Sequence, residues 1–127
     1  MHSEDINGNT LEHWTPDDLQ AALDRNEITL IDVRTPQEYM FEHIRGALLA
    51  PMAEFDPAFM PPAPGRPLVF HCGSGVRSRK VAALYLAAGH EKIAHLEGGF
   101  AAWKTAHKPY IGTNMATGAP QSVPGAE

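Results

Sequence analysis

The chain lacks a second cysteine: Cys72 is the one thiol in 127 residues, so no disulfide can form within it. A single thiol suits a reducing compartment. The chain also lacks a long hydrophobic run, because the longest, residues 81–88, is far shorter than the roughly 20 residues that span a bilayer. Residues 1–10 lack the apolar core of a signal peptide. These absences predict a cytoplasmic protein with no membrane partner.

An excess of basic residues is missing as well. Fifteen Asp and Glu outnumber ten Lys and Arg, and the formal net charge of −5 argues against a nucleic-acid partner. The seven histidines include no pair at the helical spacing typical of zinc ligands, so we expect no metal site, and we expect no cofactor. The apolar content of 43% is ordinary and is enough for the core of one globular domain.

Strand-like and helix-like segments alternate along the chain. Short aliphatic runs predict the strands, and Thr15 and Thr35, each followed by a proline, are typical of helix starts. The strands are expected at 29–33, 47–50, 68–71 and 92–96, and the helices at 16–26, 36–42, 78–88 and 100–106. This alternation favours an α/β fold in which a mostly parallel sheet carries helices on both faces.

The domain is expected to occupy residues 11–109. Residues 1–10 are polar and are predicted to form a flexible N-terminal tail. Residues 110–127 are rich in Gly, Pro, Ser and Thr and show no periodicity, so they are predicted to be disordered. The sequence leaves open whether the protein is a monomer or a homodimer.

Cys72 stands between a predicted strand and a predicted helix, at the carboxyl end of a parallel strand, where such sheets place their sites. Gly73 and Gly75 let successive backbone N–H groups turn inward and form an anion-binding nest. The start of the helix adds a positive partial charge. Both effects favour an accessible thiolate, the nucleophilic form. Lowering the pKa of a free thiol from about 8.5 by about two units takes about 2.7 kcal/mol.

The rest of this loop has expected roles of its own. Arg77 closes the loop and can orient a sulfonate or carboxylate through two hydrogen bonds. Ser74 and Ser78 offer hydroxyl donors, Ser78 is also a candidate helix cap, and Val76 completes the loop. The competing interpretation is a buried cysteine that serves only as a small core residue. Two glycines, an arginine and a helix start in one segment favour the reactive thiol.

Four sequence blocks occur in order between Trp14 and Pro109. They are residues 30–39 (LIDVRTPQEY), 43–47 (HIRGA), 72–78 (CGSGVRS) and 96–103 (LEGGFAAW). With these blocks the chain resembles the rhodanese-like domain family, in the single-domain form of thiosulfate sulfurtransferases. The resemblance implies a five-stranded, mostly parallel sheet with helices on both faces, and it implies that residues 72–78 are the active-site loop.

The resemblance also implies transfer of sulfane sulfur through a persulfide on Cys72. The thiolate would take the outer sulfur of a small-molecule donor, thiosulfate or a persulfide, and pass it to a thiol or to cyanide. Preorganised N–H donors suit both steps, because each step moves negative charge onto or off the cysteine sulfur. Without a second cysteine the chain has no resolving thiol, so the acceptor must be external.

Two other functions stay open. Related phosphatases have five residues between cysteine and arginine, whereas four separate Cys72 from Arg77; the preceding His71 is a feature that this chain shares with them. A Cys-dependent phosphatase or arsenate reductase relative is therefore one alternative, and a sulfur carrier or binding module is the other. An ion-paired network that supports the strand end and the next helix beneath the loop is expected from three charged residues: Asp32, Arg34 and Glu38.

Overall fold

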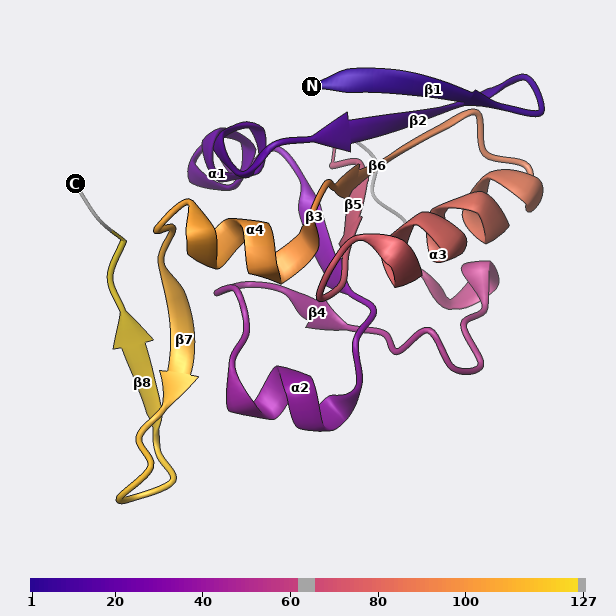
Figure 1. The fold of residues 1–127 in the computed structure, drawn as a ribbon. Coiled ribbons are helices and arrows are strands. Elements are labelled where there is room, and N and C mark those ends of the chain that lie inside the picture. The colour runs from indigo at the N-terminus through magenta and orange to yellow at the C-terminus, as the bar shows by residue number, and fades with distance from the viewer. Residues whose placement is uncertain (62–65, 126–127) are drawn as a thin grey trace.

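The structure, a computed structural model, describes residues 1–61 and 66–125. Six strands form its central sheet: β1 (His2–Ile6), β2 (Asn9–Trp14), β3 (Thr29–Asp32), β4 (Leu48–Leu49), β5 (Leu68–His71) and β6 (Lys92–Leu96). Their order across the sheet is β1-β2-β6-β5-β3-β4 (Figure 1). β1 and β2 are antiparallel, and the other neighbouring pairs are parallel. The carboxyl ends of the parallel strands β3 and β5 therefore lie at the same end of the sheet.

Four α-helices and a short 3-10 helix complete the domain: α1 (Pro16–Asp24), α2 (Pro36–Phe41), η1 (Pro57–Phe59), α3 (Val76–Ala87) and α4 (Gly99–Thr105). The two Thr-Pro signals mark helix starts as predicted, because the Thr15 and Thr35 side chains each accept a hydrogen bond from the third helical N–H. In return, Asp18 and Glu38 accept from the backbone N–H groups of these two threonines, which completes a capping box at each helix.

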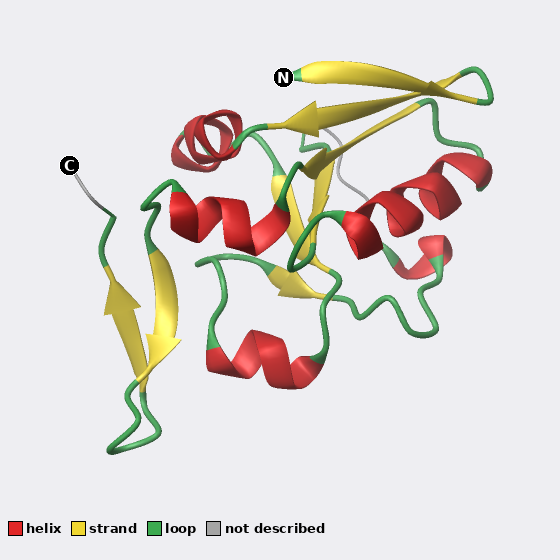
Figure 2. Ribbon diagram, in the orientation of Figure 1, coloured by secondary structure: helices red, strands yellow, loops and turns green. Residues whose placement is uncertain are grey.

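Helices cover both faces of the sheet, which confirms the predicted α/β class (Figure 2). Successive strand residues alternate between the faces, so Leu30 and Val69 join a core with α1 and α4, whereas Ile31 and Phe70 join a second core with α3. The sheet has six strands rather than the five expected. Within the part of the chain that the structure describes, no helix combines the length and the apolar character that a bilayer crossing requires.

The N-terminal segment is a strand, not the flexible tail that was predicted. β1 pairs with β2 along its length. Asn7 and Gly8 connect the two strands with positive φ angles of 52° and 89°, the conformation that a tight hairpin turn requires. β1 is the edge strand and has no buried residue, and in β2 only Leu11 is buried, so the hydrophobic pattern does not reveal this hairpin.

The C-terminal segment forms a hairpin, where disorder was predicted. β7 (Tyr110–Thr113) and β8 (Pro120–Val123) pair antiparallel, apart from the main sheet. Ile111 and His43 exchange two backbone hydrogen bonds, of 2.8 and 2.9 Å, which attach the hairpin to the chain after α2. The hairpin therefore gains its order from partners distant in sequence. The last two residues of the predicted tail, 126–127, lie outside the described residues.

Candidate active site

The Cys72 sulfur lies at the carboxyl end of β5, inside a turn of inward-pointing backbone N–H groups. The N–H groups of Gly75 and Ser78 approach Sγ at 3.0 and 3.3 Å. Gly75 adopts a φ of 98° as the N-cap of α3, a conformation that side chains other than glycine rarely take. It allows α3 to begin at Val76, so that its first turn, with its free N–H groups, faces the sulfur. The predicted nest is present.

The pKa of the Cys72 thiol lies below its ordinary value. Burial alone would raise this pKa, but hydrogen bonds from the backbone and hydroxyl of Ser78, then from the N–H groups of Ser74 and Gly75, outweigh the burial. The thiolate is thus stabilised by fixed donors and needs no adjacent general base in direct contact. This is the property that distinguishes a reactive cysteine from an inert core thiol.

The N-terminus of α4 supports the loop from below. The N–H groups of Phe100 and Ala101 donate to the carbonyls of Cys72 and Gly73, at 2.8 and 3.0 Å. A Cβ on Gly99 would lie 2.5 Å from the Cys72 carbonyl oxygen, and the φ of Gly99 is +61°. Only glycine allows this close approach of two backbones.

An ion pair closes the loop above the thiol. The Arg77 guanidinium donates to the Glu38 carboxylate of α2 in a two-pronged contact, Nη1 to Oε1 at 2.7 Å and Nη2 to Oε2 at 3.0 Å. Arg77 Nη2 also lies 3.1 Å from the point where Gly73 would carry a Cβ. The sequence favours an accessible thiol, whereas Cys72 has an exposed fraction of 0%. A substrate can reach the sulfur only if the groups that cover it move.

Both partners of the Arg77–Glu38 pair have shifted pKa values. The hydrogen bonds from Arg77 lower the pKa of Glu38 to about 2, against an opposing effect of burial. The same contact raises the pKa of Arg77, to which the Cys72 thiolate also adds. Arg77 is therefore a permanent cation close to the sulfur, held by a carboxylate that an anionic substrate could replace.

The expected ion-paired network is present for two of its three residues. Arg34 Nη2 donates to Asp32 Oδ2 at 2.8 Å, and both side chains are buried. Arg34 Nη2 also donates to the Glu42 carbonyl at 2.6 Å, so it ties the end of β3 to the end of α2. Glu38 is not part of this network, because its carboxylate pairs with Arg77 of α3. Sequence spacing could not predict that partner, which is 39 residues away.

Ser78 does not cap α3, as the sequence suggested that it could. Its side chain is buried, and its Oγ lies 2.8 Å from His95 Nδ1 and 3.6 Å from the Cys72 sulfur. His95 and its neighbour His13 are polar groups that the sequence analysis did not connect with the site. No motif marks them; the signal that could have found His13 is the Asn7–Gly8 turn, which predicts the edge hairpin.

One group of side chains has the composition of a metal site. Ligand-type atoms of His2, His13 and Glu97 lie within 4.8 Å of one another. The rings of His2 and His13 stack at 4.5 Å with an interplanar angle of 14°, so they do not converge on a shared point. Both His13 nitrogens already lie at hydrogen-bond distance from other side chains. The arrangement fits ring stacking better than coordination.

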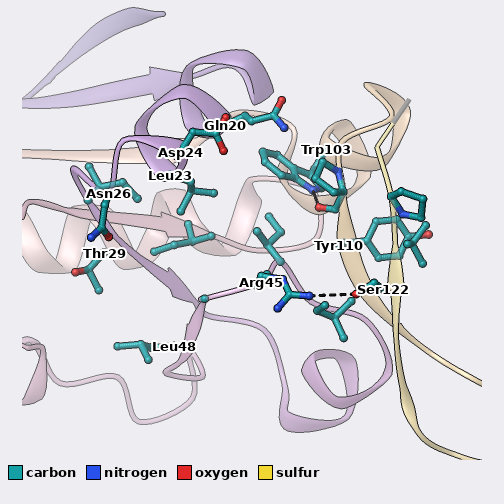
Figure 3. A pocket seen from close by; sticks show the side chains of 18 of the residues that line it. Gln20, Leu23, Asp24, Asn26, Thr29, Arg45, Leu48, Trp103, Tyr110 and Ser122 are labelled. Carbon is teal, nitrogen blue, oxygen red and sulfur yellow. Dashed lines mark hydrogen bonds between the residues drawn. The ribbon is translucent and has the colours of Figure 1, made fainter. Parts of the chain in front are cut away.

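A cavity of about 580 Å³ lies away from the thiol, between α1, the start of β3 and the C-terminal hairpin (Figure 3). Its apolar wall includes Leu23 and Trp103, and Arg45 crosses to Ser122 of β8 at 3.1 Å. None of residues 72–78 lines it. Thr29 opens β3 whereas Cys72 follows the last residue of β5, so the cavity and the thiol lie at opposite ends of parallel strands. The two sites are separate.

The residues that form this site fall within a region that matches a known protein family. Residues 15–106 match the model of the rhodanese-like domain. The chain belongs to the rhodanese-like domain family. This match spans the strand end, the loop and the α4 support described above, and it leaves the β1–β2 hairpin and the C-terminal hairpin outside.

Relatives of this rhodanese-like domain include single-domain enzymes. The thiosulfate sulfurtransferase GlpE of Coxiella burnetii is 32% identical over 104 residues, which cover 82% of this chain and 91% of GlpE. An uncharacterized protein of Synechocystis sp. is 39% identical over 101 residues, or 80% of this chain, but the chain spans only 56% of that relative's length. A rhodanese-related protein of Thermoplasma volcanium shares the fold, with a TM-score of 0.68 at 22% identity over 79% of this chain and 97% of its own.

Proposed function

We propose that this rhodanese-like domain is a sulfurtransferase that carries sulfane sulfur on Cys72. The observation that carries the proposal is the Cys72 sulfur, held at 3.0 and 3.3 Å by the N–H groups of Gly75 and Ser78. The same donors stabilise a thiolate and a persulfide anion, which are the two resting forms that such a transfer needs. The GlpE relatives, named as thiosulfate sulfurtransferases, support thiosulfate as the donor.

The first half of the reaction forms the persulfide. The Cys72 thiolate attacks the outer sulfur of thiosulfate, the bond between the two thiosulfate sulfurs breaks, and sulfite leaves with the electron pair. Cys72 then carries one extra sulfur and one negative charge. In the second half an external thiolate or cyanide attacks that outer sulfur, and the Cys72 thiolate is released. No oxidant or reductant is consumed, and the negative charge stays among the same N–H donors.

Arg77 binds the donor in this scheme. Because Arg77 is close enough to Cys72 for the thiolate to affect its pKa, the sulfonate end of the donor takes the place of the Glu38 carboxylate on the guanidinium. Residues 73–76 form the turn that surrounds the transferred sulfur. Asp32 and Arg34 remain beneath as support, and they touch neither the sulfur nor the donor.

The test is the intact mass of the protein before and after thiosulfate. The expected result is an increase of one sulfur atom on Cys72, which cyanide then removes as thiocyanate. Cys72→Ser should show neither change. No added sulfur with thiosulfate or with a low-molecular-weight persulfide would refute the proposal. Steady, Cys72-dependent hydrolysis of an aryl phosphate without persulfide would instead establish the phosphatase alternative.

A further inference from the structure

A line of side-chain hydrogen bonds runs from the Cys72 sulfur to the outer edge of the sheet. The Sγ lies 3.6 Å from Ser78 Oγ, which lies 2.8 Å from His95 Nδ1. His95 Nε2 lies 2.9 Å from His13 Nδ1, and His13 Nε2 lies 2.9 Å from Glu4 Oε1. We call Ser78, His95, His13 and Glu4 the histidine chain. Its members come from α3, β6, β2 and β1 in turn.

Sheet register holds the histidine chain in place. His13 and His95 are direct partners on the parallel strands β2 and β6. Glu4 lies on β1, diagonally opposite His13 of β2. His13 pairs directly with His2, and the side chains of His2 and Glu4 share a face because they are two residues apart. Leu11 and Ile93, two residues before each histidine, pack on the α3 side of the sheet. The histidines therefore point toward the same layer as Cys72 and Ser78.

Every link has a donor and an acceptor when the thiol is neutral. The thiol donates to Ser78 Oγ, and the Ser78 hydroxyl donates to His95 Nδ1. His95 then donates from Nε2 to His13 Nδ1, and His13 donates from Nε2 to the Glu4 carboxylate. Because each neutral imidazole has one donor and one acceptor nitrogen, both rings suit these roles.

The same links can also run in reverse. If the thiol proton passes to Ser78, the serine proton to His95 Nδ1 and the His95 Nε2 proton to His13, three bonds change direction together. Ser78 then donates to the thiolate, His95 donates to Ser78, and His13 donates to His95. The product is a Cys72 thiolate and a His13 imidazolium beside the Glu4 carboxylate. Proton and charge are conserved, and no group is left without a partner.

We propose that the histidine chain moves the proton of Cys72 to His13, on the strand next to the edge of the sheet. Ser78 is the member that contacts the sulfur; His95, His13 and Glu4 are positioning residues that act through it. The path gives a thiol with an exposed fraction of 0% a way to ionise without opening its cover. Its use in sulfur transfer rests on the proposed function.

The charges around the two rings support this assignment. Burial, followed by the nearby His13 and Arg79, lowers the pKa of His95 to about 4, so His95 is neutral and free to exchange one proton for another. Glu4 acts in the opposite direction on His95, and His2 adds a small lowering effect. Hydrogen bonds from Arg79 and His13 lower the pKa of Glu4, which keeps it an anion ready to pair with protonated His13.

Two members of the histidine chain lie outside the region that matches the family model. His13 and Glu4 precede the matched residues 15–106 and belong to the β1–β2 hairpin. The hairpin thus has a chemical role in the proposal besides extending the sheet. Its edge position explains how a proton reaches solvent, since the Glu4 side chain is 35% exposed.

The first test measures how fast iodoacetamide alkylates Cys72 between about pH 5 and about pH 10, a range that spans ordinary thiol pKa values. His13→Gln and His95→Gln keep a hydrogen-bonding side chain but cannot take up a proton. We expect the apparent pKa of Cys72 to rise by about one unit in both, so that alkylation near pH 6 slows about tenfold and is unchanged near pH 10. His90→Gln is the matched control, because His90 does not belong to the histidine chain. Profiles equal to that of the unaltered protein would overturn the proposal.

The second test is reciprocal and covers the case in which buried His95→Gln fails to fold. Alkylation removes the charge of Cys72, so it should shift the imidazole nitrogen NMR signals of His13 while it leaves those of His90 in place. His13 signals that ignore alkylation would refute the coupling. Neither test uses a sulfur donor. The two tests can therefore refute the proton path while persulfide formation is confirmed, or support the proton path while persulfide formation is refuted.

Discussion

Replacing Glu38 with glutamine tests whether the ion pair over the loop competes with the donor. Glu38 Oε1 takes part in two contacts: it accepts from Arg77 Nη1 in the ion pair, and it accepts from the Thr35 N–H at the start of α2. A glutamine amide oxygen can still accept from Thr35, so the capping box and the helix should persist. The charge that holds Arg77 is lost. The variant therefore leaves at most one neutral hydrogen bond to the guanidinium, and it weakens the hold on Arg77 without removing Arg77.

The size of the effect follows from the pair itself. The pKa of Glu38 falls from 4.5 to about 2, which for a fully buried pair would represent about 3 kcal/mol. The Glu38 side chain is 37% exposed, however, so solvent screens the attraction and about 1 kcal/mol is expected to remain. If thiosulfate must displace Glu38, removing that competition should lower the KM for thiosulfate about fivefold.

The assay is thiocyanate formation as a function of thiosulfate concentration. We expect Glu38→Gln to lower KM and Arg77→Ala to raise it, while Arg77→Ala affects iodoacetamide alkylation less. Asp18→Asn is the matched control, because Asp18 occupies the equivalent capping-box position in α1 and should leave KM unchanged. An unchanged or higher KM in Glu38→Gln would show that Glu38 orients Arg77 for the donor rather than competing with it.

Two further predictions concern stability. Gly99→Ala should lower the free energy of unfolding in urea by about 2 kcal/mol or more, because its Cβ would lie 2.5 Å from the Cys72 carbonyl oxygen. Gly46→Ala is the control: Gly46 has a φ of +85° but nothing within 4 Å of the added Cβ, so the loss should be only about 1 kcal/mol. Equal losses in the two variants would contradict the close approach at Gly99. The free energy of unfolding should also fall as the pH drops from about 6.5 toward 4. Burial lowers the pKa values of His71 and His95 in the folded protein to about 4, so the unfolded chain binds protons first, and the loss is roughly 2 to 3 kcal/mol for each histidine. A free energy of unfolding that stays constant between pH 7 and about 4.5 would refute this prediction.

The two hairpins show where sequence patterns stop. Continuous apolar runs reveal strands that are buried on both faces, such as β3 and β5, whose eight residues are all buried except the half-buried Thr29. β1 and β8 are polar edge strands, and their order comes from pairing with distant or neighbouring backbone rather than from burial. The Asn7–Gly8 turn was the one local signal available, and it predicts the N-terminal hairpin.

Sequence alone determined the α/β class, the helix starts at Thr15 and Thr35, and the loop from Cys72 to Ser78, because these depend on local spacing, capping chemistry and backbone freedom. Tertiary structure alone decided that Glu38 pairs with Arg77, and that His13 and His95 stand in register behind Ser78. Such pairings join residues that are 17 to 82 positions apart. They exist only because parallel strands bring remote segments to the same edge, a geometry that no window along the chain contains.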